Sequence, residues 1–208
     1  MTTLLEKHKA RERALQLSRD TVRFSANAIR AIHRQEFQQA RELLSQVTRY
    51  LRETEEVLEG HRDIYYAGFV EDAQKEYVEA LATLAFSEGS ALPMPEQLGV
   101  SVAAYLNGLG EAVGELRRYI LDSLRRGDSS RCEELLEVMD EVYTLLITMD
   151  FPEAITRGLR RTCDAMRGVL ERTRGDLTMA LQQRSLEQRL GAYEEYLMVE
   201  ERPLVDEP

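Results

Sequence analysis

The sequence predicts an all-α fold, a bundle of six or seven helices in a single domain spanning residues 1–208. Three observations lead to this prediction. Apolar residues recur every three or four positions through most of the chain, and no segment shows the alternating pattern of a strand. Proline occurs only at positions 93, 95, 152, 203 and 208. With 43% hydrophobic residues, the chain can bury a core of ordinary size without disulfides.

Three helices are expected in the proline-free N-terminal part of the chain. The first is predicted from Leu4 to Arg34, the second from Glu36 to Leu58 and the third from Asp63 to Phe86. Gly60 and His61 separate the second helix from the third, because glycine commonly ends a helix.

A loop and two further helices follow. Residues 87–99 contain two prolines and two glycines and are expected to form the loop. The next helix is predicted over Val100–Arg126, where leucines spaced by three and four are typical of a bundle seam. Ser129 or Ser130 is the expected N-cap of a helix that ends near Met149.

The last helical segment is expected to start at Pro152, since proline is tolerated in the first turn of a helix. A break is predicted near Gly175 or Gly191. Residues 192–208 are rich in acidic side chains and are interpreted as a solubilising tail.

The formal net charge of −10 conceals an uneven distribution. Residues 1–34 hold eight basic and three acidic side chains, a charge of +5, so residues 35–208 carry −15. The acidic total therefore does not exclude a nucleic-acid partner, but it confines the basic surface to the first helix.

Two of the predicted helices carry pairs of carboxylates. Glu76 and Glu79 are three residues apart, and Glu111 and Glu115 are four apart, so each pair shares one helix face. If the two helices pack side by side, four carboxylates can meet, which suits Mg²⁺ and the hydrolysis of phosphoesters. Glu79, Glu111 and Glu115 point away from the apolar stripes and Glu76 lies about 80° from its stripe, so spacing alone favours ordinary solvated faces.

Two segments resemble the most diagnostic helices of the translin/Trax family. They are GFVEDAQKEYVEA at 68–80 and AYLNGLGEAVGELRR at 104–118. Shorter matches are SRD at 18–20, IRAIHR at 29–34, GLRR at 158–161 and TRGDL at 173–177. The resemblance covers roughly residues 10–185 and is closest to the archaeal, Trax-like branch.

The resemblance implies a translin-type helical bundle that self-associates, as a homo-octamer, into a shell around single-stranded RNA or DNA. Trax-type subunits are Mg²⁺-dependent endoribonucleases, with Mn²⁺ as an alternative ion. Their acidic residues correspond to Glu76, Glu79, Glu111 and Glu115. Glu79 and Glu115 match the expected metal ligands, and Glu76 or Glu111 would position the attacking water. Glu111 replaces an Asp of Trax-type subunits, and its extra methylene can shift that water.

The nucleic-acid contacts are expected on the first helix. The candidates are Arg19, Arg23, Arg30, His33 and Arg34, whose spacing places the arginines along one side. Basic side chains of this kind bind phosphate without sequence preference. Spacing alone favours a solvated face, and the resemblance shifts the interpretation toward nucleic acid.

The leading interpretation is therefore a metal-dependent endoribonuclease that acts on single-stranded RNA. The main alternative is a non-catalytic, translin-like protein that binds single-stranded DNA or RNA. A third interpretation, an all-α nucleotide pyrophosphohydrolase, would need Glu-x-x-Glu followed by Glu-x-x-Asp, whereas the second element here is Glu-x-x-x-Glu.

A cytoplasmic location without a membrane partner is expected. No apolar run approaches the ~20 residues needed to span a bilayer, and the first residues lack the apolar region of a signal peptide. Cys132 and Cys163 are isolated thiols, which fits a reducing compartment.

Overall fold

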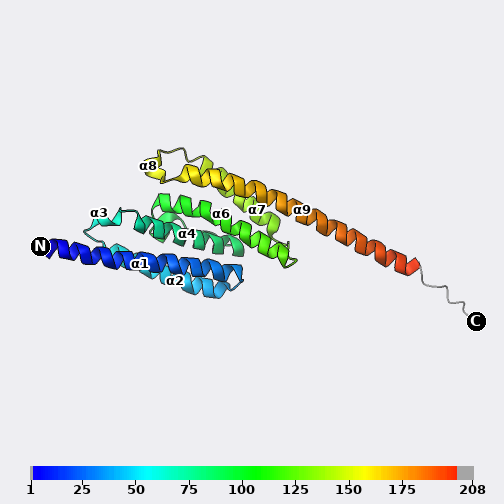
Figure 1. Ribbon diagram of the computed structural model, residues 1–208, viewed down its shortest axis with the longest axis horizontal. Helices are drawn as coiled ribbons and strands as arrows, with labels where there is room; N and C mark the ends of the chain where they lie inside the picture. Colours follow the sequence, from blue (N-terminus) through cyan, green and yellow to red (C-terminus); the bar gives the residue numbers. More distant parts are fainter. Residues whose placement is uncertain (1, 201–208) are drawn as a thin grey trace, which may run out of the picture.

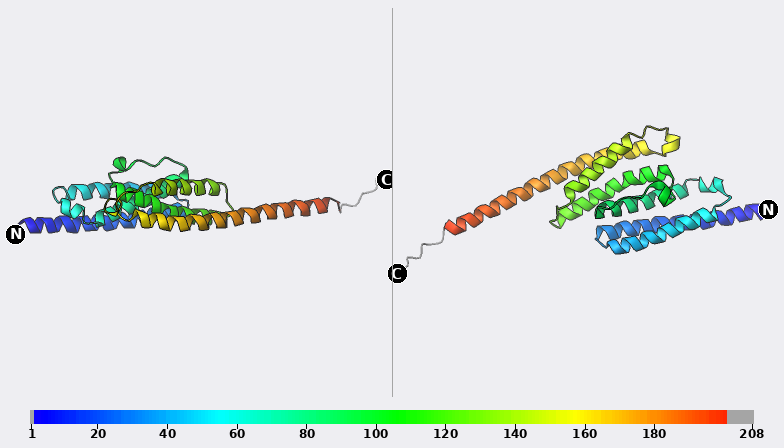
Figure 2. Two further views of the ribbon diagram at one scale, coloured as in Figure 1. Left: turned by 90° about the horizontal axis from the view of Figure 1, so that it is seen from above. Right: turned by 180° about the vertical axis from the view of Figure 1, so that it is seen from behind.

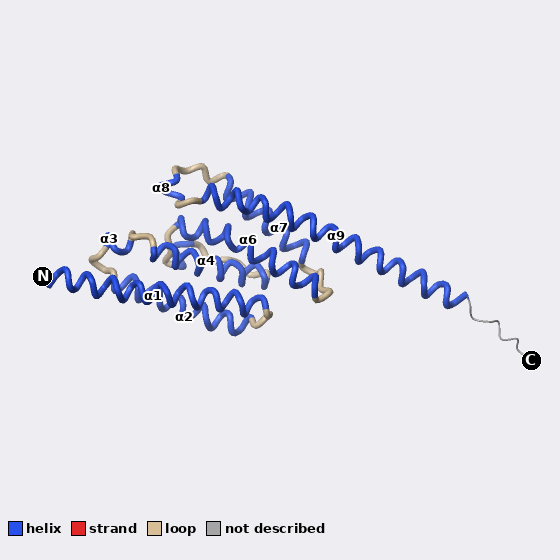
Figure 3. Tube along the Cα trace, in the orientation of Figure 1, coloured by secondary structure: helices blue, strands red, loops and turns tan. Residues whose placement is uncertain are grey.

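The computed structural model describes residues 2–200, and it is all-α as predicted, with no strand in that range (Figure 3). Six of the nine helices described are long, in agreement with the predicted number, and three are single turns. The long helices are α1 (Thr2–His33), α2 (Phe37–Val57), α4 (Phe69–Glu88), α6 (Val102–Arg125), α7 (Cys132–Ile147) and α9 (Leu159–Glu200). The single turns are α3 (Arg62–Tyr65), α5 (Pro95–Leu98) and α8 (Glu153–Thr156).

The helices form a stack in which α4 and α6 lie at the centre (Figure 1). Helix α1 packs against α2 and α4, while α6 packs against α4, α7 and α9. Helices α1, α4, α6 and α9 run in one direction, and α2 and α7 return in the other (Figure 1). The two central helices are therefore parallel, which aligns their residues in register.

The parallel arrangement depends on the long connection between α4 and α6. Gly89 ends α4 in the left-handed conformation with φ of 69°, which suits glycine. The Tyr105 hydroxyl donates to the Pro93 carbonyl at 3.1 Å and holds the returning chain. The Ser101 hydroxyl then accepts from the Ala104 amide at 3.0 Å and caps α6.

Two predicted helix starts need correction. The third helix is interrupted at Gly68, whose φ of 99° separates α3 from α4. Helix α7 begins at Cys132, and neither predicted serine caps it. The Asp128 carboxylate accepts hydrogen bonds from the amide and hydroxyl of Ser130, at 3.0 and 2.7 Å, so that serine is held in the preceding turn.

The predicted break in the last segment is also wrong in place. Pro152 lies at the N-cap of α8, and the chain breaks at Arg157 and Gly158, which both have positive φ. Helix α9 continues through Gly175 and Gly191 without a break. A glycine inside a helix costs only about 1 kcal/mol, and the helix-forming residues around these two outweigh it.

Helix α9 projects beyond the bundle in every view (Figures 1 and 2). Its residues 182–197 are all exposed in the single chain. Residues 192–200 of the predicted acidic tail are the end of this helix, and residues 201–208 lie outside the described part.

The main core lies where α6 meets its neighbours. Leu116, Ile120, Met139, Leu146 and Met166 are among the largest side chains that are completely buried. Both cysteines are free thiols, one buried and one partly buried. None of the helices in residues 2–200 is long and apolar enough to cross a membrane.

Candidate metal centre and nucleic-acid surface

A close approach of α4 and α6 builds the candidate site. A Cβ added to Gly108 on α6 would lie 2.7 Å from the Lys75 carbonyl oxygen and 2.7 Å from the Val78 Cβ, both on α4. Only glycine allows the two backbones to come this near. Because the helices are parallel, Glu111 then lies beside Glu76 and Glu79.

The structure brings three of the four predicted carboxylates together. Each of Glu76, Glu79 and Glu111 offers a carboxylate oxygen, and these oxygens lie within 4.8 Å of one another. All three side chains are half-buried between the central helices. Oxygen-only donors at this spacing fit a hard divalent cation such as Mg²⁺ or Mn²⁺ better than a softer metal.

The electrostatics of the cluster also favour a cation. Burial raises the pKa of Glu79 to about 8, and the charges of Glu76, Glu111 and Glu115 add to the increase. Burial also raises the pKa of Glu76, which Lys75 partly offsets. Joint ionisation of these carboxylates is therefore unfavourable in the metal-free protein, and a bound cation would relieve the repulsion.

Lys75 is a member of the site that the sequence reasoning missed. Its Nζ lies 2.6 Å from Glu111 Oε1. Burial lowers the pKa of Lys75, but the hydrogen bond to Glu111 and the charges of Glu76 and Glu79 raise it, and the net change is an increase. The available signal was its place directly before Glu76 on a helix already expected to carry ligands.

Glu115 is set apart from the other three carboxylates. Its Oε2 lies 2.5 Å from Nε2 of His33, the last residue of α1. Glu115 lies one turn after Glu111 on α6, and its charge contributes to the raised pKa of Glu79. Its role as a metal ligand stays a prediction.

His33, predicted as a nucleic-acid contact, is buried. Its side chain is 5% exposed, and it points from α1 toward α6. A buried ring has little access to nucleic acid, so the contact with Glu115 is the interaction that the structure gives it.

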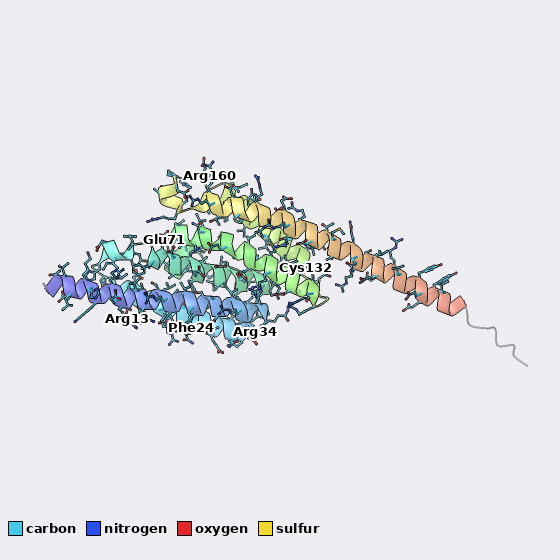
Figure 4. The ribbon with its side chains drawn as sticks, in the orientation of Figure 1. Arg13, Phe24, Arg34, Glu71, Cys132 and Arg160 are labelled. Atoms are coloured by element: carbon cyan, nitrogen blue, oxygen red, sulfur yellow. The ribbon has the colours of Figure 1, made fainter. Side chains whose placement is uncertain are left out.

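The four predicted arginines are all exposed. Arg23 pairs with Asp20 at 2.8 Å, and Arg30 donates to Asn27 Oδ1 at 2.7 Å. Arg19 has no polar partner among residues 2–200. Arg34 lies just past the end of α1, where it pairs with Glu36 (Figure 4).

The direction in which three of these arginines point around α1 can be compared with that of His33. At 100° per residue, Arg19, Arg23 and Arg30 all point within about 80° of the direction of His33. His33 is buried against Glu115, whereas the three arginines are exposed, so they extend along the solvent side of α1 next to His33. The row covers about 20 Å of helix from His33 to Arg19.

A cleft of about 620 Å³ opens on the other side of Glu111. It lies between α4, α6 and the turn from α8 to α9. Its wall carries charge of both signs, from Lys75, Arg157 and Arg161 and from Glu71, Asp72, Glu111 and Glu153, and Arg157 Nε lies 3.7 Å from a carboxylate oxygen of Glu71.

Comparison with known proteins places this arrangement in context. The model of the Translin family matches residues 5–173, which include both carboxylate helices. The chain belongs to the Translin family. An uncharacterised protein of Methanocaldococcus jannaschii is 28% identical over 189 residues, which is 90% of this chain and 83% of that protein.

Solved structures agree with the Translin-family fold. The crystal structure of AfC3PO has a TM-score of 0.79 and 34% identity, over 88% of this chain and 95% of the other. The structure of an AfC3PO–duplex RNA complex has a TM-score of 0.77 and 33% identity with the same coverage. The crystal structure of apo-NeC3PO shares the fold at a TM-score of 0.78 and 20% identity, over 86% and 94% of the two chains.

Proposed function

We propose that this chain is a Mg²⁺-dependent endoribonuclease that binds and cleaves single-stranded RNA inside an oligomeric shell, with single-stranded DNA as a second ligand. The observation that carries the proposal is the cluster of Glu76, Glu79 and Glu111, three half-buried carboxylates from two parallel helices. Similarity to AfC3PO, which has been solved in complex with duplex RNA, supports RNA as the partner.

The residues divide the work between two helices. Glu79 lies deepest in the electrostatic field of the cluster, so it is the central ligand for the cation, and Glu76 and Glu111 complete the site. A bound Mg²⁺ would supply an activated water and stabilise the charge that develops on the phosphate. Lys75 fixes one oxygen of Glu111 and leaves the other available.

The exposed arginines of α1 provide the binding surface in this proposal. Arg19, Arg23 and Arg30 are exposed along α1 on the solvent side of His33, and they can pair with successive phosphates of a strand. Such contacts carry no sequence information, so they would hold any strand that reaches the site.

One observation favours the alternative, a non-catalytic protein that binds nucleic acid. The Lys75 ammonium already neutralises part of the cluster through its contact with Glu111. If the lysine served only to balance buried carboxylates, the protein would bind RNA without cleaving it.

A cleavage assay separates the two functions. Labelled RNA, single-stranded or duplex, is incubated with the protein in Mg²⁺ or in chelator. We expect cleavage in Mg²⁺ only, and we expect the double substitution Glu79→Ala with Glu115→Ala to abolish it while the assembly stays intact. Binding without cleavage by the wild type would establish the alternative. Unchanged cleavage by the purified double variant would show that Glu79 and Glu115 are not needed for cleavage. Comparing the two RNA forms, with single-stranded DNA as a third ligand, defines the preferred substrate.

A further inference from the structure

The interaction between His33 and Glu115 connects two helices far apart in sequence. His33 ends α1, and Glu115 lies 82 residues later, in the middle of α6. An ionised carboxylate only accepts hydrogen bonds, so the imidazole Nε2 carries the proton and donates to Oε2 at 2.5 Å. This contact fixes one oxygen of a side chain that otherwise has three rotatable bonds.

The backbone that carries His33 is held firmly. The Glu36 amide donates to the Ala31 carbonyl at 2.9 Å, and the Gln35 amide donates to the Ile32 carbonyl at 2.8 Å. With Gln35 at φ 63°, these two bonds form a Schellman motif that ends α1. The ring therefore projects from a fixed point rather than from a fraying helix end.

The other nitrogen of the ring shows that packing alone does not explain His33. Nδ1 is buried and has no hydrogen-bond partner in the part of the chain that the structure describes. A buried polar atom without a partner destabilises the fold, and an apolar ring would fill the same space without that cost. Among the described residues, the side chain of His33 has its polar interaction with Glu115, and that interaction is the advantage that histidine has here.

Glu115 in turn lies beside the carboxylate cluster. It follows Glu111 by one turn on the same face of α6, yet it is not among the three residues whose oxygens already converge. Its side chain is 25% exposed, so without His33 it is free to turn toward water.

We propose that His33 is a positioning residue that holds Glu115 beside Glu79, so that Glu115 becomes the fourth carboxylate around the cation. The proposal rests on the proposed function, because it assumes that the cluster binds a divalent ion. By fixing Oε2, the imidazole directs the remaining oxygen of Glu115, as outer residues orient metal ligands elsewhere.

The test compares two replacements of the histidine. His33→Phe keeps a ring of similar size and removes the donor, whereas His33→Gln places an amide donor near the position of Nε2. Mn²⁺ binding is measured without RNA, by calorimetry and by the electron paramagnetic resonance spectrum of the bound ion. We expect His33→Phe to weaken Mn²⁺ binding about tenfold or more and to change the spectrum, and His33→Gln to restore both.

A second background shows whether His33 acts through Glu115. In Glu115→Gln protein, His33→Phe should weaken Mn²⁺ binding little further, because the ligand it positions is already altered. Equal losses in both backgrounds, or wild-type affinity in His33→Phe, would overturn the positioning role while leaving the metal site intact. Absence of Mn²⁺ binding by the wild type would overturn the proposed function as well. If His33→Phe does not fold, His33→Leu takes its place.

Discussion

Glu79 is a carboxylate in a half-buried site among other carboxylates, and both burial and the neighbouring charges oppose its ionisation. Burial raises its pKa to about 8 from the ordinary value of 4.5. A folded-state pKa above the unfolded one means that Glu79 favours the fold below pH 4.5 and that this contribution is lost as the pH rises through about 8.

We therefore expect the metal-free protein to be less stable at about pH 9 than at about pH 6, by on the order of a few kcal/mol. Glu79→Gln should flatten this dependence, because the amide does not ionise. Thermal unfolding in chelator measures both proteins. Mg²⁺ should raise the melting temperature of the wild type more at the higher pH, where the carboxylate is free to bind it.

The matched control is Glu55→Gln, which removes an exposed carboxylate from α2. This variant should follow the wild-type pH profile. A Glu79→Gln protein that lost stability with pH as steeply as the wild type would contradict the assignment of the titration to Glu79.

Prediction from the sequence succeeded for some residues and failed for others, for physical reasons. Spacing put Glu76 with Glu79 on one helix face, and the family resemblance paired them with Glu111. The contact between His33 and Glu115 depends on how α1 packs against α6, and no local pattern contains that information. For the same reason, the sequence does not identify Lys75 as the partner of Glu111.

Two glycines of α6 differ in how closely they pack against other helices. Gly108 is in contact with the backbone of α4, whereas a Cβ added to Gly114 would meet nothing within 4 Å. The helix boundaries were largely predictable, because glycine and proline act locally. The approach of α6 to α4 at Gly108 was not, because it depends on the pairing of two distant helices.

We expect Gly108→Ala to destabilise the protein by about 1–3 kcal/mol, since the new methyl group overlaps α4. The same change should weaken Mn²⁺ binding by moving Glu111 away from Glu79. Gly114→Ala, in the same helix, should stabilise by ~0.5–1 kcal/mol. Chemical denaturation measures both, and equal effects of the two substitutions would contradict the close contact.

The exposed arginines of α1, Arg19, Arg23 and Arg30, are the proposed RNA-binding surface. Replacing Arg19 and Arg23 with Gln should weaken RNA binding and reduce its dependence on salt by about 0.7 per lost phosphate contact. Mn²⁺ binding should not change, because neither arginine contacts a carboxylate of the cluster.

Fluorescence anisotropy at several salt concentrations measures this effect. Arg174→Gln is the control, because Arg174 pairs with Asp140 between α9 and α7, away from α1. If both changes reduced the salt dependence equally, α1 would not be the binding surface.

The whole molecule has one feature that a single chain does not explain, the projecting half of α9. Leu186, Leu190, Tyr193 and Leu197 follow one another at spacings of four, three and four, and all are exposed. Apolar residues at alternating spacings of three and four form the contact surface between paired helices. An isolated helical segment with an apolar stripe is marginal in water, so its stability calls for a partner. Self-association through α9 therefore fits the proposed homo-octamer, whereas a monomer leaves this stripe in water.

If the chains assemble through α9, we expect Leu186→Glu combined with Leu190→Glu to give species smaller than the wild-type assembly, because two charges would then face a partner helix. Light scattering after size exclusion measures the mass, and circular dichroism checks that the bundle remains helical. Gln188→Glu is the control, since it adds a charge to the opposite face of the same turn of α9. Mn²⁺ binding should survive in the smaller species, because all four carboxylates come from one chain, whereas RNA cleavage should fall if the strand must be enclosed. An unchanged mass for the double variant would mean that the chains assemble through another surface.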